Sequence, residues 1–419
     1  MWQGNGEPRV QRDDPRNNLS RASEIFRFGW GNSPLKVMIV LGARPQFIKS
    51  APVVHEFLKR ADVKLQMIHS GQHYDYRLSR LFFEELNLPS PLLNLKVGSG
   101  SHAVQTGRAM ISLERCMLGA KPDVVLVPGD TNTTLAAALA AVKLCVPVAH
   151  IEAGARSYDM SMPEEINRRL TDHVSSMLFA PTETTAQNLY AEGIPHERVH
   201  LVGDTMVDAL LAALPAASKL RDKLLSEFDA TEREYVLVTA HRPGNVDEPG
   251  SLKSIVEALV ETSKRVKVVF PAHPRILNRL KAFHLLGRLR QCRSLFLIKP
   301  IGYLELVALL ESAAVVLTDS GGLQKEAFLL GVPCVTMRNA TEWTETLRDG
   351  ANVLVGVNKT KILEAILEAT RNHGPRSRRI YSDNPFGRGN AAGRIADAIL
   401  RGHAKDIRNT GSAAGKLPH

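Results

Sequence analysis

Cysteine, aromatic residues and long apolar runs are scarce in this chain of 419 residues, and each shortage excludes a class of protein. The four cysteines form no Cys-x-x-Cys pair and no Cys/His cluster, so neither a zinc site nor a disulfide framework is expected. Few, scattered cysteines are typical of a reducing compartment, which predicts a cytoplasmic location. Cys145 and Cys334 lie in apolar, strand-like segments and are expected in the core.

Membrane and cofactor signals are also missing. No apolar run approaches the roughly 20 residues that cross a bilayer, so membrane insertion is not expected. Residues 1–35 are polar apart from a brief apolar patch, match no signal peptide and are predicted to form a disordered extension. Because the chain contains no P-loop, no zinc signature and no complete Gly-x-Gly-x-x-Gly fingerprint, we expect no metal and no nicotinamide or other cofactor.

Positive charge, by contrast, is in excess. The formal net charge of +10 favours an anionic partner, either a nucleic acid or a phosphorylated metabolite. The basic residues are scattered apart from one dense run at 376–379, aromatic residues make up only 5% of the chain, and no nucleic-acid motif is present. We therefore expect a phosphorylated small molecule and no nucleic acid.

Short β-branched runs alternate with amphipathic stretches from residue 36 onward, which predicts an α/β fold with parallel sheets. The alternation occurs in two blocks separated by the strand-free stretch 203–234, so we expect two doubly wound Rossmann-like domains, 36–205 and 206–380, facing a central cleft. Residues 403–419 are expected to form a flexible tail. Strands are expected at 37–41, 64–69, 123–127, 146–151, 177–180 and 199–202 in the first domain, and at 235–239, 266–270, 295–298, 314–318 and 333–337 in the second.

Three acidic side chains lie on loops near the ends of buried strands in the first block. These are Asp130, Glu152 and Glu164. Carboxylates on the carboxyl-end loops of a parallel sheet predict proton-transfer chemistry on a bound small molecule. Simpler interpretations remain: Asp130 caps a helix, Glu164 is a first-turn acid, and Glu152 forms a structural ion pair with Arg156 or Arg168.

Four basic or titratable side chains also follow strands. Arg44 and Lys49 belong to a glycine turn that opens a helix, where free backbone N–H groups predict an anion site. Both side chains either reach a phosphate or are solvated. His241 and His273 each follow a strand of the second block and either donate to a phosphate or a leaving group, or have no catalytic role.

A second glycine turn, in the second block, consists of Ser320, Gly321 and Gly322. Its backbone can approach phosphate oxygens closely at a helix N-terminus, although a bare turn of this kind is a weak signal. Glu326 lies one helical turn further on and can accept hydrogen bonds from ribose hydroxyls. The turn therefore predicts a nucleotide site across the cleft from Arg44.

Taken together and in order, these motifs resemble the non-hydrolysing UDP-N-acetylglucosamine 2-epimerase family over about residues 36–400. The resemblance implies the glycosyltransferase-B type of two-domain fold, with a crossover helix at 381–402 that packs on the first domain. The motifs are Gly-Ala-Arg-Pro-Gln-Phe-Ile-Lys at 42–49, Gly-Gln-His at 71–73, Gly-Asp-Thr at 129–131, His-Ile-Glu-Ala-Gly at 150–154, Pro-Glu-Glu-Ile-Asn-Arg at 163–168, His-Arg at 241–242, Asp-Ser-Gly-Gly at 319–322 and Asn-Pro-Phe-Gly at 384–387.

The resemblance also implies a reaction: UDP leaves across C1 and C2 of the sugar to give a glycal, then adds back after a proton reaches the other face of C2. It needs no nicotinamide and suggests a homodimer. Its site residues are implied as follows: Asp130, Glu152 and Glu164 as the acid/base set; Arg44, Lys49, Arg168 and His241 on the diphosphate, with His241 also counted as catalytic; Ser320, Gly321, Gly322 and His273 in the substrate-binding group; and Glu326 on the ribose.

Three segments depart from the common family pattern. The usual Gln-Glu-Glu-Ala is Gln-Lys-Glu-Ala at 324–327, and the usual Thr-Glu-Arg-Pro-Glu is Thr-Glu-Trp-Thr-Glu at 341–345. Lys325 and Trp343 are similar to the branch that acts on UDP-2,3-diacetamido-2,3-dideoxyglucuronate. That substrate, and a glycosyltransferase of the same fold, are the alternatives.

The third departure is His-Arg-Pro-Gly-Asn at 241–245 in place of His-Arg-Arg-Glu-Asn. By resemblance, the lost charged pair helps bacterial members to hold a second, activating substrate molecule. We therefore expect hyperbolic initial-rate curves against UDP-N-acetylglucosamine. Strongly sigmoidal curves that are reset by added UDP-N-acetylglucosamine would contradict this expectation.

Overall fold

The computed structural model describes residues 34–71, 83–371 and 384–413, with side chains described up to residue 403. The predicted extension therefore lies outside the described residues except for its last two positions, of which Leu35 opens a strand. The basic run at 376–379 also lies outside them.

The first domain is built on a seven-stranded sheet in the order β3-β2-β1-β4-β5-β6-β7, the doubly wound arrangement that the alternation predicts. All neighbouring strands pair in parallel. Alternate residues of β1 enter two different apolar clusters, Ile39 one and Met38 the other, because both faces of the sheet are covered. The elements are β1 (Leu35–Leu41), α2 (Arg44–Leu58), β2 (Val63–His69), β3 (Leu93–Asn94), α4 (His102–Ala120), β4 (Val124–Pro128), α5 (Asn132–Lys143), β5 (Val148–Ile151), α6 (Pro163–Val174), β6 (Met177–Ala180), α7 (Glu183–Ala191) and β7 (Val199–Leu201).

The second domain repeats this plan with a six-stranded sheet in the order β10-β9-β8-β11-β12-β13, again all parallel. The expected class of two doubly wound domains is confirmed. The elements are β8 (Tyr235–Thr239), α9 (Pro243–Val246), α10 (Pro249–Ser263), β9 (Lys267–Pro271), α11 (Pro274–Ala282), α12 (Leu286–Arg290), β10 (Leu295–Ile298), α13 (Tyr303–Ser312), β11 (Val315–Thr318), α14 (Gly321–Leu330), β12 (Cys334–Thr336), β13 (Asn352–Leu354) and α15 (Lys359–Arg371).

Strand order reverses between β1 and β4 in the first sheet and between β8 and β11 in the second. Ligands of open α/β sheets bind at such switch points, outside the carboxyl ends of the strands. Arg44 and Asp130 follow the two central strands of the first sheet, and His241 and Ser320 follow those of the second. These four predicted residues thus lie at the switch points of the two domains.

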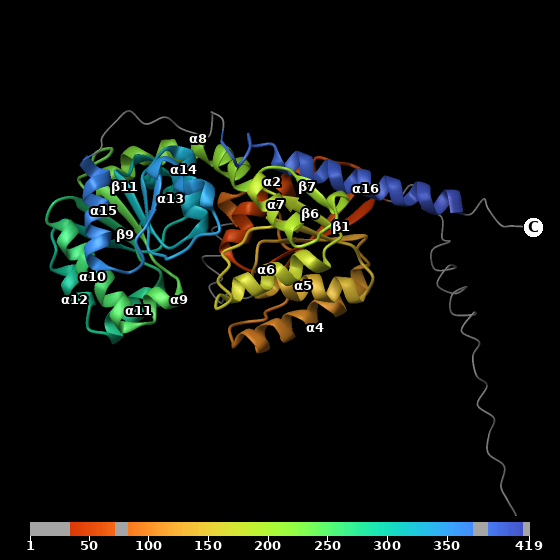
Figure 1. Ribbon diagram of the computed structural model, residues 1–419, viewed down its shortest axis with the longest axis horizontal. Coiled ribbons are helices and arrows are strands. Elements are labelled where there is room, and N and C mark those ends of the chain that lie inside the picture. The colour runs from red at the N-terminus through yellow and green to blue at the C-terminus, as the bar shows by residue number, and fades with distance from the viewer. Residues whose placement is uncertain (1–33, 72–82, 372–383, 414–419) are drawn as a thin grey trace, which may run out of the picture.

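The chain crosses between the domains twice, and a long helix follows each domain (Figure 1). The chain leaves the first sheet through α8 (Thr205–Glu227) and returns through α16 (Ala391–Ala413), which lies along the first domain in contact with α2 and α8. The helix continues past the expected end at residue 402 as far as Ala413. Residues 414–419 lie outside the described part.

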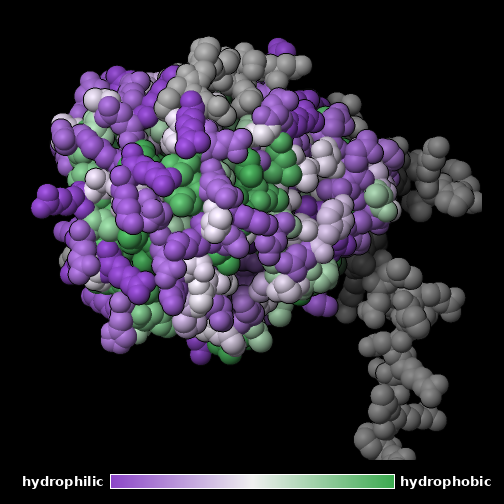
Figure 2. Space-filling model, turned by 60° about the vertical axis from the view of Figure 1, so that its left-hand side comes forward, coloured by the Kyte–Doolittle hydropathy of each residue, from purple (hydrophilic) through white to green (hydrophobic). Residues whose placement is uncertain are grey.

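One apolar cluster runs through both domains and includes Phe179, Leu210 and Phe328. Cys334 is buried in β12 as predicted. Cys145 is exposed, contrary to prediction, because it occupies a turn with a φ of 57° before β5 begins. Within the described ranges, no helix combines the length and apolar character needed to cross a bilayer. Figure 2 shows hydrophilic residues spread over most of one face, with smaller apolar areas between them.

Candidate active site

The carboxyl ends of β4 and β5 bring two predicted acids onto adjacent loops. Because these strands pair as far as Pro128 and Ile151, Asp130 and Glu152 leave the sheet at neighbouring points. Glu152 has a φ of 71°, a left-handed conformation that is uncommon for any residue except glycine. Its side chain is nevertheless buried. Backbone strain of this kind persists where surrounding contacts hold it, and it is concentrated at functional sites.

Two lysines, one from each domain, hold the Glu152 carboxylate. Lys49 of α2 forms an ion pair with one oxygen, and Lys325 of α14 donates to the other at 2.7 Å. Burial alone raises the pKa of Glu152, but the ammonium groups of Lys325 and Lys49 outweigh it and hold the pKa below its ordinary value. Glu152 therefore does form ion pairs, but its partners are these two lysines and not Arg156 or Arg168. Lys49 contacts a carboxylate here, whereas the sequence places it on a phosphate.

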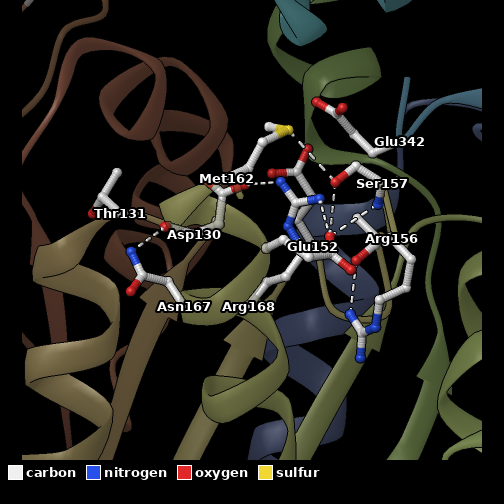
Figure 3. Close-up of polar contacts among 12 residues, drawn as sticks. Asp130, Thr131, Glu152, Arg156, Ser157, Met162, Asn167, Arg168 and Glu342 are labelled. Atoms are coloured by element: carbon white, nitrogen blue, oxygen red, sulfur yellow. Dashed lines mark hydrogen bonds and ion pairs between the residues drawn. The ribbon is translucent and has the colours of Figure 1, made fainter. Parts of the chain in front are cut away.

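Asp130 pairs with Arg168 of α6, whose guanidinium lies 2.6 Å from its carboxylate. Arg168 also contacts Glu165 at 3.0 Å and faces Glu342 of the second domain (Figure 3). Burial lowers the pKa of Arg168, but these carboxylates outweigh it and raise the pKa. The Asp130 side chain remains 32% exposed, and Thr131, not Asp130, caps α5. Asp130 is therefore an accessible carboxylate with an anchored partner.

The start of α6 divides its two acids between core and surface. Glu165 is fully buried and accepts hydrogen bonds from the amide and hydroxyl of Ser157 and from Arg168 and Arg169. Glu164 is half-buried and lies in the first turn of the helix. Among the described residues, no contact joins it to Glu152 and no ion pair holds it. Glu165 is thus a structural anchor, whereas Glu164 is a partly accessible acid at the start of the helix.

The second glycine turn forms as predicted. The hydroxyl of Ser320 caps α14 by accepting from the amide of Leu323 at 3.5 Å. Gly321 and Gly322 form the first turn, where backbone N–H groups have no partner within the helix. A Cβ at Gly321 would lie 2.5 Å from the carboxylate of Glu342, so a larger residue would have to displace that side chain. The turn therefore offers a close backbone approach to an anion.

Glu326 lies one turn into α14 and is buried. The hydroxyl of Tyr303 donates to its carboxylate at 2.8 Å. Burial raises the pKa of Glu326 to about 7, although the Tyr303 hydrogen bond and the Lys325 ammonium oppose the shift. A carboxylate of this kind accepts hydroxyl donors and changes charge near neutral pH.

The two predicted histidines lie in different surroundings. Nδ1 of His241 lies 3.0 Å from the buried carboxylate of Asp319, which also accepts from the amide of Arg242. Burial raises the pKa of Asp319, but His241 and the backbone amides bring it to about 2. The His241 side chain is 55% exposed and therefore accessible to a ligand. His273 is an exposed cap of α11 that accepts from the Arg275 amide at 3.2 Å.

The first glycine turn uses its amides differently from what the sequence predicts. The N–H groups of Gly42 and Ala43 donate to the side chain of Gln46 at 2.7 and 3.0 Å, so a residue of the same helix occupies them. Arg44 reaches across the domain boundary and donates to the carbonyl of Ile301 at 3.5 Å. An anion at this turn would therefore be bound by the Arg44 side chain and not by the backbone amides of Gly42 and Ala43.

Comparison with known proteins identifies the family. The family model described as UDP-N-acetylglucosamine 2-epimerase matches residues 55–400. This chain belongs to that family. A UDP-N-acetylglucosamine 2-epimerase homolog of Methanococcus maripaludis is 47% identical, covering 87% of this chain and 99% of the relative. A UDP-2,3-diacetamido-2,3-dideoxy-D-glucuronate 2-epimerase of Pseudomonas aeruginosa is 44% identical, covering 88% and 100%.

Solved structures of epimerases in this family have the same fold. The UDP-GlcNAc 2-epimerase of Methanocaldococcus jannaschii, crystallised with UDP-GlcNAc and UDP, has a TM-score of 0.81 and 45% identity, covering 88% of this chain and 100% of that one. The two-domain fold of glycosyltransferase-B type is thus confirmed. Among the described residues, no group of His, Cys, Asp and Glu is arranged to hold a metal ion.

Four further charged residues of this epimerase surround the predicted ones: Asp204, Asp319, Lys325 and Glu342. Asp319 pairs with His241 and Lys325 with Glu152, whereas Asp204 pairs with Lys325 and Glu342 interacts electrostatically with Arg168. Asp319 follows β11 as Asp130 follows β4, and that equivalence is a signal which could have identified it. The other three give no such signal, because their partners are distant in the sequence.

Proposed function

We propose that this chain interconverts UDP-N-acetylglucosamine and UDP-N-acetylmannosamine without releasing free sugar. One observation carries the proposal. In a chain of this family, the loop after β5 holds Glu152 against the helix of the other domain that carries the glycine turn and Glu326, and the neighbouring loop after β4 carries Asp130. Acid/base groups from one domain and a diphosphate site from the other are what the reaction requires.

The reaction needs two proton transfers and no cofactor. One carboxylate takes the C2 proton while the C1–O bond to UDP breaks, and the C–H electrons form the C1–C2 double bond of a glycal. UDP then adds back to C1, and an acid group on the opposite face returns a proton to C2. Asp130, Glu152 and Glu164 are proposed as this acid/base set.

The remaining site residues act on the nucleotide. We assign them to stabilising the departing diphosphate and holding the ribose, because a cationic, dipole-lined site lowers the cost of charge on the leaving group. The group consists of Arg44, Lys49, Arg168, His241 and His273, the turn Ser320, Gly321 and Gly322, and Glu326 on the ribose.

Incubation with UDP-N-acetylglucosamine in D₂O, followed by proton NMR, tests the proposal. Deuterium at C2 of both epimers, with UDP still attached, is the expected result. Release of UDP without exchange at C2 would overturn it in favour of hydrolysis or glycosyl transfer. UDP-2,3-diacetamido-2,3-dideoxyglucuronate is assayed in parallel, and exchange of this sugar alone would replace the proposed substrate.

We further propose the setting in which the enzyme works: a cytoplasmic homodimer that supplies an N-acetylmannosamine unit to polysaccharide biosynthesis. Its units are proposed as a first Rossmann-like domain at 36–205, a nucleotide-binding Rossmann-like domain at 206–380 and a crossover segment at 381–402 that packs on the first domain. Sedimentation analysis tests the dimer, and a single species at the monomer mass would exclude it.

UDP affinity should increase with pH through Glu326. Ribose hydroxyls that donate to this carboxylate stabilise its ionised form, so UDP binding lowers the pKa of about 7 and releases a proton. We expect UDP to bind roughly threefold to tenfold more tightly at pH 7.5 than at pH 5.5, since one pKa unit corresponds to about 1.4 kcal/mol. Isothermal titration calorimetry measures both the affinity and the proton release.

Glu326→Gln is the matched control for this dependence. The raised pKa also means that the folded state binds more protons than the unfolded state between about 4.5 and 7. Unliganded stability attributable to Glu326 is therefore present at low pH and lost as the pH rises through 7. A pH dependence of UDP affinity that persists unchanged in Glu326→Gln would contradict this assignment.

A further inference from the structure

Lys325 is the most deeply buried cation in contact with the proposed acid/base set. Its side chain is 1% exposed, and its ammonium donates to Glu152 of the first domain and to Asp204. The ammonium also lies 3.7 Å from the ring centroid of Trp343. Burial lowers the pKa of Lys325, but the carboxylates of Asp204 and Glu152 outweigh it and raise the pKa. Lys325 is therefore a fixed cation that has no direct access to a ligand.

Asp204, the second partner, lies where both connections between the domains meet. Its side chain caps α8 by accepting from the amide of Met206 at 2.9 Å. Its own amide donates at 2.8 Å to the carbonyl of Phe386, in the segment that leads back to α16. Gly203 and Gly387 pack against each other at this point, with φ values of 91° and 89°. The outgoing and returning chains are thus joined at Asp204.

Trp343 completes the connection from the other side. Its ring covers Lys325 and lies 6.1 Å from the ring of Phe386, measured between centroids. Lys325 is consequently enclosed by the crossover on one side and by Glu152 on the other. Lys325 thus bridges Glu152 and the point where the two interdomain connections meet.

We propose that Lys325 is a positioning residue which couples the geometry of the interdomain crossover to the orientation and charge of Glu152. The expected effect on turnover rests on the proposed function; the structural coupling itself does not. Lys325 does not touch the sugar; it acts through Glu152. The coupling requires one ammonium to hold two carboxylates that belong to different parts of the fold.

The charges around Glu152 define what removal of Lys325 does. Lys49 faces Glu152 from α2 and Lys325 faces it from α14, while Asp204 lies behind Lys325 at the start of α8. Glu326 of α14 faces the two lysines. Without Lys325, Glu152 keeps one cation in a buried site where desolvation favours the protonated form. Without the Asp204 charge, Glu152 keeps both lysines, but Lys325 is no longer held to the crossover.

Two variants separate these effects. Lys325→Met removes the charge at similar volume, and Asp204→Asn keeps a helix-capping side chain but removes its charge. We expect both to lower kcat about 10²-fold, the scale of a misplaced catalytic group, with KM within threefold of the wild type. Lys325→Met alone should develop an acidic limb in the pH profile of kcat above pH 5. Lys361→Met, at an exposed position of α15, is the control and should match the wild type.

Hydrogen exchange of the backbone provides a readout besides activity. Peptides that cover 203–206 and 384–387 should exchange faster in Lys325→Met than in Lys361→Met. Variants that unfold at a lower temperature but keep the wild-type pH profile and exchange rates would show that Lys325 is merely structural, which would overturn the inference. If the wild type incorporates no deuterium at C2 of the sugar, the proposed function fails. The backbone hydrogen exchange of Lys325→Met then still tests the coupling: faster exchange supports it, and unchanged exchange overturns it.

Discussion

Glu152→Gln should lower the turnover of C2 epimerisation by roughly 10²–10⁴, the usual contribution of an acid/base group, while the protein still folds. The amide has the same shape as the carboxylate but cannot accept a proton. Folding should survive because Lys325 keeps Asp204 as a partner, and the Lys49 side chain is 14% exposed and keeps some contact with water. Deuterium incorporation at C2 and thermal unfolding measure the two effects separately.

Glu183→Gln is the control for this substitution, because Glu183 is an exposed glutamate in the first turn of α7. It should have wild-type turnover. If Glu152→Gln unfolds while the control does not, the carboxylate serves as a structural ion pair. Normal turnover in a folded Glu152→Gln would remove Glu152 from the acid/base set altogether.

The strands were predictable to the extent that they are long and apolar. The elements β6, β8 and β10 begin and end at the predicted residues, because each is a short apolar or β-branched run that starts directly after a polar residue. The edge strands β3 and β13 are two and three residues long, too short to show any periodicity. The apolar neighbours of Cys145 predict a core position, but Cys145 lies in an exposed turn before β5.

The site was predictable within each domain and unpredictable across the boundary. Asp130 and Glu152 could be placed together, because the carboxyl ends of neighbouring parallel strands always meet at one edge of the sheet. The contact between Lys325 and Glu152, and the proximity of Arg168 to Glu342, depend on how the two sheets are placed relative to each other. Periodicity within one domain carries no information about that placement.

Gly154→Ala should be the most destabilising single substitution near the site. Gly154 has a φ of 82°, and a Cβ there would lie 2.1 Å from the backbone oxygen of Thr185. We expect a loss of roughly 2–5 kcal/mol in the free energy of unfolding, combining about 1–2 kcal/mol of left-handed strain with about 1–3 kcal/mol of overpacking. Turnover should also fall, because the Gly154 amide donates to Asp172 beside the Glu152 loop.

Gly193→Ala isolates the two contributions. Gly193 has nearly the same φ, 80°, but no atom lies within 4 Å of the position that a Cβ would take. This variant should lose only the strain of about 1–2 kcal/mol and keep normal turnover. Urea denaturation of both proteins gives the difference directly. Equal losses would mean that backbone strain alone explains the effect, and the close packing of Gly154 against α7 would then not be what fixes the loop that carries Glu152.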